Sequence, residues 1–256
     1  MSVQAARAAA FRALHVPGAP LVLFNIWDVG SARAVAAAGA KALATGSWSV
    51  AAAHGYADGE ALPFELALAN LRRIVAATEL PVTIDLESGY GPHPEDVARV
   101  IGQAVEAGAV GCNLEDSFPA DGSLRPIADA AARVAAARRA AERAGVSAFV
   151  NARTDVFFQG PADSHDAAAV NAALDRAEAY ADAGADGLFV PGLADERLIA
   201  SLVERSPLPV NIMAGAATPP LARLAELGVA RVSHGPGPYR LAMQVIEAAA
   251  RTALGA

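Results

Sequence analysis

One sequence unit recurs along most of the chain: an alanine-rich stretch of helical character, a glycine, and then an apolar run that ends in polar residues. Examples are "AAAGAKALATGS", "VEAGAVGCNLED" and "ADAGADGLFVPG". Glycine directly after a helix is the usual left-handed cap, and short apolar runs are typical of buried parallel strands. Because strands alternate with helices, the repeat predicts one parallel sheet covered by helices.

Eight strands are predicted, near residues 21–28, 42–47, 82–88, 111–116, 148–155, 187–192, 209–214 and 231–236. Eight such units in 256 residues match a (β/α)₈ TIM-type barrel, and we expect a single α/β domain of this kind over residues 1–256. The alternative is an open doubly wound sheet, which usually carries a Gly-x-Gly-x-x-Gly turn after its first strand. That turn here reads "WDVGSARA", so the barrel is favoured.

The composition narrows the class of partner. The net charge of -7 argues against nucleic acid and against anionic membrane surfaces, and no apolar run reaches the roughly 18 residues that a membrane span needs. A single cysteine, Cys112, permits no intrachain disulfide, so a reducing cytoplasm is expected. The only lysine, Lys41, lies just before the second strand, which excludes a Schiff-base aldolase with its strand-end lysine.

In a barrel the active site lies at the carboxyl ends of the strands. Asp85 and Glu87 end the predicted third strand in alternate positions, so they should point the same way, and Glu115 ends the neighbouring fourth strand. Three carboxylates without a nearby lysine favour a hard divalent cation, Mg²⁺ first and Mn²⁺ as a substitute. A zinc site would need His or Cys, and only His234 ends a strand. The alternative is that these acids are solvated loop residues or helix caps.

Further polar residues gather at the same end. Arg153 ends the fifth strand, and its guanidinium suits a substrate carboxylate or a developing enolate oxygen, although a structural ion pair to Glu115 is the alternative. Asn211 ends the seventh strand.

Gly46 and Ser47, at the end of the second strand, allow close backbone approach, so their N–H groups could hold a carboxylate. Trp48 follows as either a binding or a packing residue. Asp58 lies in the small-residue loop "VAAAHGYADGEALPFE", which is long enough to act as a lid.

The motifs "GYAD", "DLESGYG", "NLED" and "NARTD" together resemble the isocitrate lyase / phosphoenolpyruvate mutase superfamily. "DLESGYG" is similar to the family's Asp-x-Asp-x-Gly-Tyr-Gly, with Glu87 at the second Asp, and the likeness runs from "NIWDVGSAR" to "SHGPGPYR". The resemblance implies a Mg²⁺-dependent enzyme. It also implies a homo-oligomer, since family members exchange a C-terminal helix; we expect a dimer or tetramer.

The resemblance also implies roles for individual residues. Asp85 would contact Mg²⁺ directly, and Glu87 and Glu115 partly through water. Ser47 and Trp48 match the segment whose backbone grips the substrate carboxylate.

Asp58 matches a mobile-loop acid near the reaction centre, Arg153 the arginine that binds substrate and steadies the enolate, and Asn211 a residue that binds a distal carboxylate. The loop "DSFPADGSLRP" departs from the family. It lacks the Cys, Lys and His of the lyases and the Lys and Asn of the phosphonate enzymes.

The sequence therefore predicts a Mg²⁺-dependent carbon–carbon lyase or decarboxylase acting through an enolate. Its substrate would be a small 2-oxo or 2-hydroxy dicarboxylic acid such as oxaloacetate or 2-oxoglutarate. Asp58, Arg153 and Glu115 are the expected catalytic residues. Two alternatives stay open: a phosphonopyruvate-type mutase or hydrolase, and a 2-oxo acid binding protein with little catalysis.

Overall fold

Each of the eight predicted strands is present in the computed structural model, which describes residues 2–255. The strands are β1 (Leu21–Leu23), β2 (Leu43–Ala44), β3 (Val82–Asp85), β4 (Gly111–Glu115), β5 (Phe149–Arg153), β6 (Gly187–Val190), β7 (Val210–Met213) and β8 (Arg231–Ser233). They pair in parallel in the order β1-β8-β7-β6-β5-β4-β3-β2. Just beyond β1, the Ile26 N–H donates to the Ala44 carbonyl (2.9 Å), which joins β1 to β2. The predicted (β/α)₈ barrel is confirmed.

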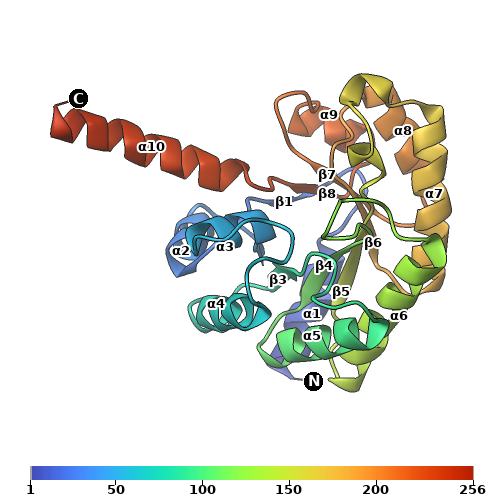
Figure 1. Cartoon of the computed structure of the whole chain (residues 1–256), viewed down its shortest axis with the longest axis horizontal. Coiled ribbons are helices and arrows are strands. Elements are labelled where there is room, and N and C mark those ends of the chain that lie inside the picture. Colours follow the sequence, from blue (N-terminus) through green and yellow to red (C-terminus); the bar gives the residue numbers. More distant parts are fainter. Residues whose placement is uncertain (1, 256) are drawn as a thin grey trace.

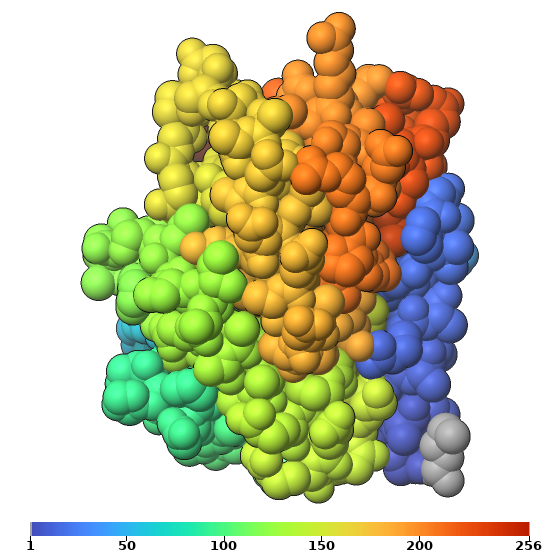
Figure 2. Space-filling model, turned by 90° about the vertical axis from the view of Figure 1, so that its right-hand side faces the viewer, coloured from blue at the N-terminus to red at the C-terminus, as the bar shows by residue number. Residues whose placement is uncertain are grey.

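Helices connect the strands and cover the outside of the barrel (Figure 1). They are α2 (Val29–Ala37), α3 (Ser47–Ala53), α4 (Phe64–Ala76), α5 (Pro94–Glu106), α6 (Ile127–Arg143), η1 (Val156–Phe158), η2 (Ala162–Ser164), α7 (Ala167–Asp182), α8 (Glu196–Arg205) and α9 (Leu221–Glu226). On one face α6, α7 and α8 pack side by side over the strands (Figure 2). Within residues 2–255, no helix combines the length and apolar character that crossing a bilayer requires.

The amino end of the barrel is closed by the first helix, α1 (Val3–Ala13). Phe11 is fully buried and meets the Phe149 ring edge-on at 5.7 Å, while His15 stacks on the same ring at 3.9 Å. Gly111 makes room for this plug, because a Cβ there would lie 3.1 Å from the Phe11 ring. The carboxyl end is therefore the one that can admit a ligand.

The interior of the barrel carries a polar layer. Asp85, Asn113 and Asn151 pair across β3, β4 and β5 in one register, and Asn211 pairs with Arg231 across β7 and β8. Barrel interiors are usually filled by branched apolar side chains. A layer of amides and a guanidinium directly beneath the mouth is a departure from that rule.

The strands end earlier than predicted, and one inference built on their length is wrong. β3 stops at Asp85, and Glu87 has a left-handed backbone (φ 49°) in a turn that also holds Tyr90 (φ 53°). Glu87 therefore does not alternate with Asp85 along one strand. Its carbonyl instead accepts the Glu115 N–H (2.8 Å), which anchors the turn to β4.

The last helix, α10 (Gly237–Leu254), projects away from the barrel (Figure 1). Pro238 is its only buried residue. Its exposed apolar side chains are Leu241, Met243, Val245, Ile246 and Leu254.

Candidate active site

A cavity of about 170 Å³ opens at the carboxyl ends of the strands. It is lined by six of the residues singled out from the sequence: Gly46, Ser47, Trp48, Asp58, Asp85 and Arg153. Its volume equals that of roughly five or six liquid water molecules, so it suits a small acid. Three other predicted residues do not line the cavity and lie behind its wall: Glu87, Glu115 and Asn211.

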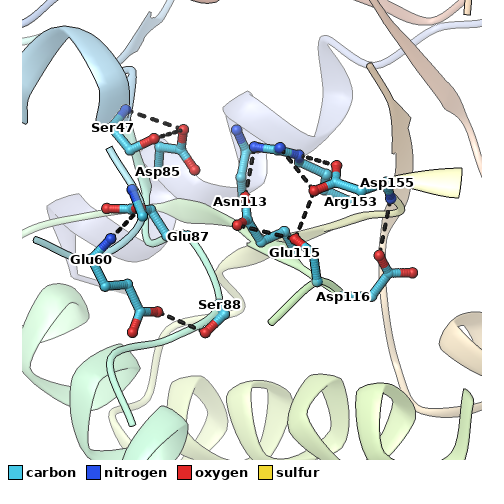
Figure 3. A network of polar contacts seen from close by, with 12 residues as sticks. Ser47, Glu60, Asp85, Glu87, Ser88, Asn113, Glu115, Asp116, Arg153 and Asp155 are labelled. Carbon is cyan, nitrogen blue, oxygen red and sulfur yellow. Dashed lines mark hydrogen bonds and ion pairs between the residues drawn. The ribbon is translucent and has the colours of Figure 1, made fainter. Parts of the chain in front are cut away.

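Asp85 is held at the cavity edge by the start of α3. Its Oδ2 accepts hydrogen bonds from the Ser47 N–H (3.1 Å) and the Ser47 hydroxyl (2.9 Å), as Figure 3 shows. The neighbouring Gly46 N–H is not free for a substrate, because it donates to the Ile26 carbonyl (3.2 Å) and closes the barrel. Ser47 alone thus fixes the Asp85 carboxylate, through its N–H and its hydroxyl, and Asp85 keeps its Oδ1 for another partner.

Glu87 ties the loop that carries Asp58 to the β3 turn. Its Oε2 accepts the N–H groups of Gly59 (2.8 Å) and Glu60 (2.6 Å). In return, the Glu60 carboxylate accepts from the Ser88 hydroxyl (2.7 Å). The two glutamates form a reciprocal latch (Figure 3) that seats Asp58 over the cavity. Burial, with the negative charges of Asp85 and Asp58, raises the pKa of Glu87 to about 7.

Arg153 sits between two carboxylates at the end of β5. Its Nη1 lies 2.6 Å from Glu115 Oε2, and its Nε donates to Asp155 Oδ1 (2.6 Å), as Figure 3 shows. The structural ion pair considered from the sequence is therefore present, and the same guanidinium also lines the cavity. Burial raises the pKa of Glu115, and the Arg153 charge opposes that shift. This pairing fixes the guanidinium in place.

Asp58 has the character of a proton carrier. Burial raises its pKa above the usual value, and the Asp85 charge adds to the effect while Arg153 opposes it. A carboxyl group with a raised pKa and direct access to a cavity is a candidate for proton transfer to and from a ligand.

Asp116, by contrast, is structural. Its Oδ2 accepts from the Tyr180 hydroxyl (2.6 Å) and from Arg176 Nη1 (3.0 Å), both on α7, so it fastens β4 to the outer helix layer.

The carboxylates at the cavity suit Mg²⁺, and they do not suit a metal ion whose ligands must all come from the protein. Within residues 2–255, no three His, Cys, Asp or Glu side chains are placed to hold an ion by themselves. Mg²⁺ does not need such a cage, because it keeps several waters and binds one or two carboxylates plus substrate oxygens. Asp85, with Glu87 and Glu115 behind it, offers that kind of set. Burial, and after it the negative charge of Asp85, raises the pKa values of both glutamates.

The one cysteine cannot serve as an acid catalyst here. Cys112 points out of the barrel interior, is 4% exposed, and burial raises the pKa of its thiol to about 12. Cys112 therefore neither lines the cavity nor carries a thiol of ordinary acidity.

Several cavity residues were not found from the sequence. Asn211 is buried below the cavity, where its Nδ2 donates to the Ser233 hydroxyl oxygen (3.1 Å), so Ser233 is the residue that faces the ligand space. The far wall is apolar, with Phe158, Phe189 and Met213. Asn113, Asn151 and Arg231, each in phase with the polar end of its predicted strand, were the available signals for the polar layer. Nothing in the local pattern pointed to the apolar wall.

Comparison with known proteins places the chain in a family. The family model for phosphoenolpyruvate phosphomutase matches residues 11–254. A crystal structure from Burkholderia cenocepacia J2315, of a protein provisionally described as a phosphonomutase, is 60% identical and covers 99% of this chain and 100% of that chain, with a TM-score of 0.95.

Two characterised relatives are more distant. The 2-methylisocitrate lyase of Salmonella typhimurium (strain LT2) is 30% identical over 215 residues, which cover 82% of this chain and 71% of the relative. A phosphonopyruvate hydrolase, solved with oxalate and Mg²⁺, is 25% identical, covers 97% of this chain and 88% of that chain, and has a TM-score of 0.83. The chain belongs to the phosphoenolpyruvate phosphomutase family, within the isocitrate lyase / phosphoenolpyruvate mutase superfamily.

Proposed function

We propose that the protein is a Mg²⁺-dependent lyase or decarboxylase that cleaves a carbon–carbon bond in a small 2-oxo or 2-hydroxy dicarboxylic acid through an enolate. One observation carries this proposal: Asp58, Asp85 and Arg153 converge on a small cavity, with Glu87 and Glu115 close behind. An excess of carboxylates over guanidinium groups calls for a cation that the ligand can share.

Residues of this chain would each have a separate role in the reaction. Arg153, fixed by Glu115 and Asp155, offers a guanidinium to the negative charge that develops on the enolate oxygen. Asp58 carries the proton exchanged with the substrate. The Glu60–Glu87 latch keeps the Asp58 loop closed and water out while the bond breaks.

Asp85, with Glu87 and Glu115, would hold Mg²⁺. When bound, the ion supplies Lewis-acid polarisation of the carboxylate and 2-oxo or 2-hydroxy oxygens. The solved relative that contains oxalate and Mg²⁺ supports the choice of this ion.

A phosphonopyruvate-type mutase or hydrolase is the second candidate, favoured by the 60% identity to the Burkholderia protein described as a phosphonomutase. Against it stands the loop after β4, residues 116–126, which contains no lysine, histidine, cysteine or asparagine. A 2-oxo acid binding protein without turnover remains the third.

A turnover assay separates the three. Purified protein is incubated with oxaloacetate, 2-hydroxy dicarboxylic acids or phosphonopyruvate, with Mg²⁺ or with EDTA, beside a protein-free control containing Mg²⁺. We expect Mg²⁺-dependent cleavage of a dicarboxylic acid above the control. Release of phosphate from phosphonopyruvate alone would favour the second candidate, and ligand binding without any turnover the third.

We also propose a homo-oligomer in which α10 packs on a second copy. The apolar side chains of α10 are exposed, with Val245 60% and Ile246 59% accessible. A groove of about 590 Å³ runs over β1 and α2, and its apolar lining includes Leu21, Val22 and Val35. Light scattering should give a dimer or tetramer. A monomer at micromolar concentration would contradict this assembly.

A further inference from the structure

Arg231 is a buried cation whose partners are all neutral. It is 1% exposed. Its Nη2 donates to Asn113 Oδ1 (3.1 Å) and its Nε donates to the Ser233 hydroxyl oxygen (3.2 Å), while Nη1 is buried without a partner in the described part of the chain. Arg153 offers the contrast, since two carboxylates neutralise it. An unneutralised buried guanidinium is costly to the fold, so its position calls for a function.

The first consequence concerns the amide of Asn113. A guanidinium has donors only, so the atom that faces Arg231 must be Oδ1. Asn151 Nδ2 donates to the same oxygen (2.9 Å) from β5. Asn113 also lines the cavity, between Asp85 and the Arg153–Glu115 pair in Figure 3. Its Nδ2 is therefore the atom left to face a ligand.

The second consequence concerns the hydroxyl of Ser233. Its oxygen accepts from Arg231 Nε and from Asn211 Nδ2 (3.1 Å). With both acceptor positions used, the hydroxyl hydrogen is free to donate into the same cavity, which Ser233 lines. One guanidinium thus aims two hydrogen-bond donors at the cavity floor from below.

We propose that Arg231 is a positioning residue that makes the cavity floor an anion subsite, in which Asn113 Nδ2 and the Ser233 hydroxyl bind the second carboxylate of the substrate. This subsite rests on the proposed function, which places the first carboxylate on the Mg²⁺ that Asp85 would hold. The buried positive charge of Arg231 also attracts the carboxylate, because water and salt screen charge–charge interactions little where water is excluded. The distal carboxylate is thereby assigned to Asn113 and Ser233, with Asn211 acting through Ser233.

The apolar far wall allows a rival outcome. Phe158, Phe189 and Met213 could select a substrate whose distal end is an alkyl group. Malate and 2-hydroxy-4-methylpentanoate distinguish an anion subsite from an apolar one. Both are 2-hydroxy acids of nearly the same shape, but the two oxygens of malate's second carboxylate are replaced by two methyl groups in the other acid.

The test is calorimetry of both acids with Mg²⁺ present. The wild-type protein should bind malate at least about tenfold more tightly, the change expected when a charged group loses its hydrogen bonds. Ser233→Ala should reduce that ratio several-fold, and Arg231→Met should bring it close to one. Arg231→Lys should restore part of it. In every variant the affinity for 2-hydroxy-4-methylpentanoate should stay within about twofold of the wild-type value. A variant whose fold is merely loosened would instead lose affinity for both acids.

Arg138→Met is the matched control, because Arg138 pairs with Asp186 outside the cavity; it should leave the ratio unchanged. If Arg231→Met does not fold by thermal melting, Ser233→Ala alone decides. Equal affinities in the wild type, or a preference for the branched acid, would overturn the subsite and leave the proposed function standing. Failure of both acids to bind would overturn the proposed function and the subsite with it.

Discussion

The two ends of the barrel differ in the kind of side chain that they carry: uncharged aromatic rings at one end and charged groups at the other. At the amino end, Phe11, His15 and Phe149 form an aromatic plug in which no side chain carries a charge at neutral pH. At the carboxyl end, Asp58, Asp85 and Arg153 surround an open cavity. The amino end gains stability from burial, while the carboxyl end holds like charges close together at a cost in stability. The contrast teaches that stability and chemistry are segregated along the barrel axis, so mutations at each end should affect different properties.

The largest effect is expected at the open end. Asp58→Asn removes the proton carrier and should lower turnover about 10²- to 10⁴-fold. The melting temperature should not fall, because the repulsion between Asp58 and Asp85 is relieved. Initial rates and thermal melts measure both quantities, with Asp163→Asn on the exposed η2 segment as the control. Activity within threefold of the parent would remove Asp58 from the mechanism.

The reverse pattern is expected at the closed end. Phe11→Ala deletes a fully buried ring and should cost about 3–5 kcal/mol of unfolding free energy. The turnover of the molecules that remain folded should change less than twofold. Urea unfolding and rates at low temperature test this, and a large loss of turnover with little loss of stability would break the division between the ends.

The closed end should also set a pH limit on stability. Burial, helped by the charges of Arg231 and Arg12, lowers the pKa of His15 from 6.5 to about 3. Below pH 6.5 the unfolded chain binds a proton at this site that the folded chain refuses, so stability falls as the pH drops from 6.5 toward 3. At pH 4.5 the loss should be roughly 2–3 kcal/mol relative to pH 7. Unfolding curves of the parent and of His15→Phe should converge at neutral pH and diverge in acid; parallel curves would show that His15 is not responsible.

The smallest effect is expected at Cys112, which belongs to neither end. Cys112→Ser should leave turnover within a few-fold and cost at most about 1–3 kcal/mol, the penalty of a buried hydroxyl without a partner. A collapse of turnover in a folded variant would revive a cysteine-dependent mechanism.

Sequence patterns were sufficient for the strands and for the end at which polar residues gather, because both follow from local periodicity. They failed at Glu87, since a left-handed backbone at a non-glycine residue leaves no mark on the pattern. The family resemblance implied a ligand role for Asn211, and in the structure its amide donates to Ser233. The Glu60–Glu87 latch joins separate segments and could be seen only once the chain was folded.

The central claim is that Asp85 holds a cation which a 2-oxo or 2-hydroxy acid shares. Calorimetry with oxalate tests it most directly, in Mg²⁺ and in EDTA, for the parent and for Asp85→Ala. We predict that the parent binds oxalate only with Mg²⁺ and that Asp85→Ala, still folded by thermal melting, binds it in neither condition. Equal oxalate binding by the two proteins, or binding by the parent that EDTA does not weaken, would contradict the account.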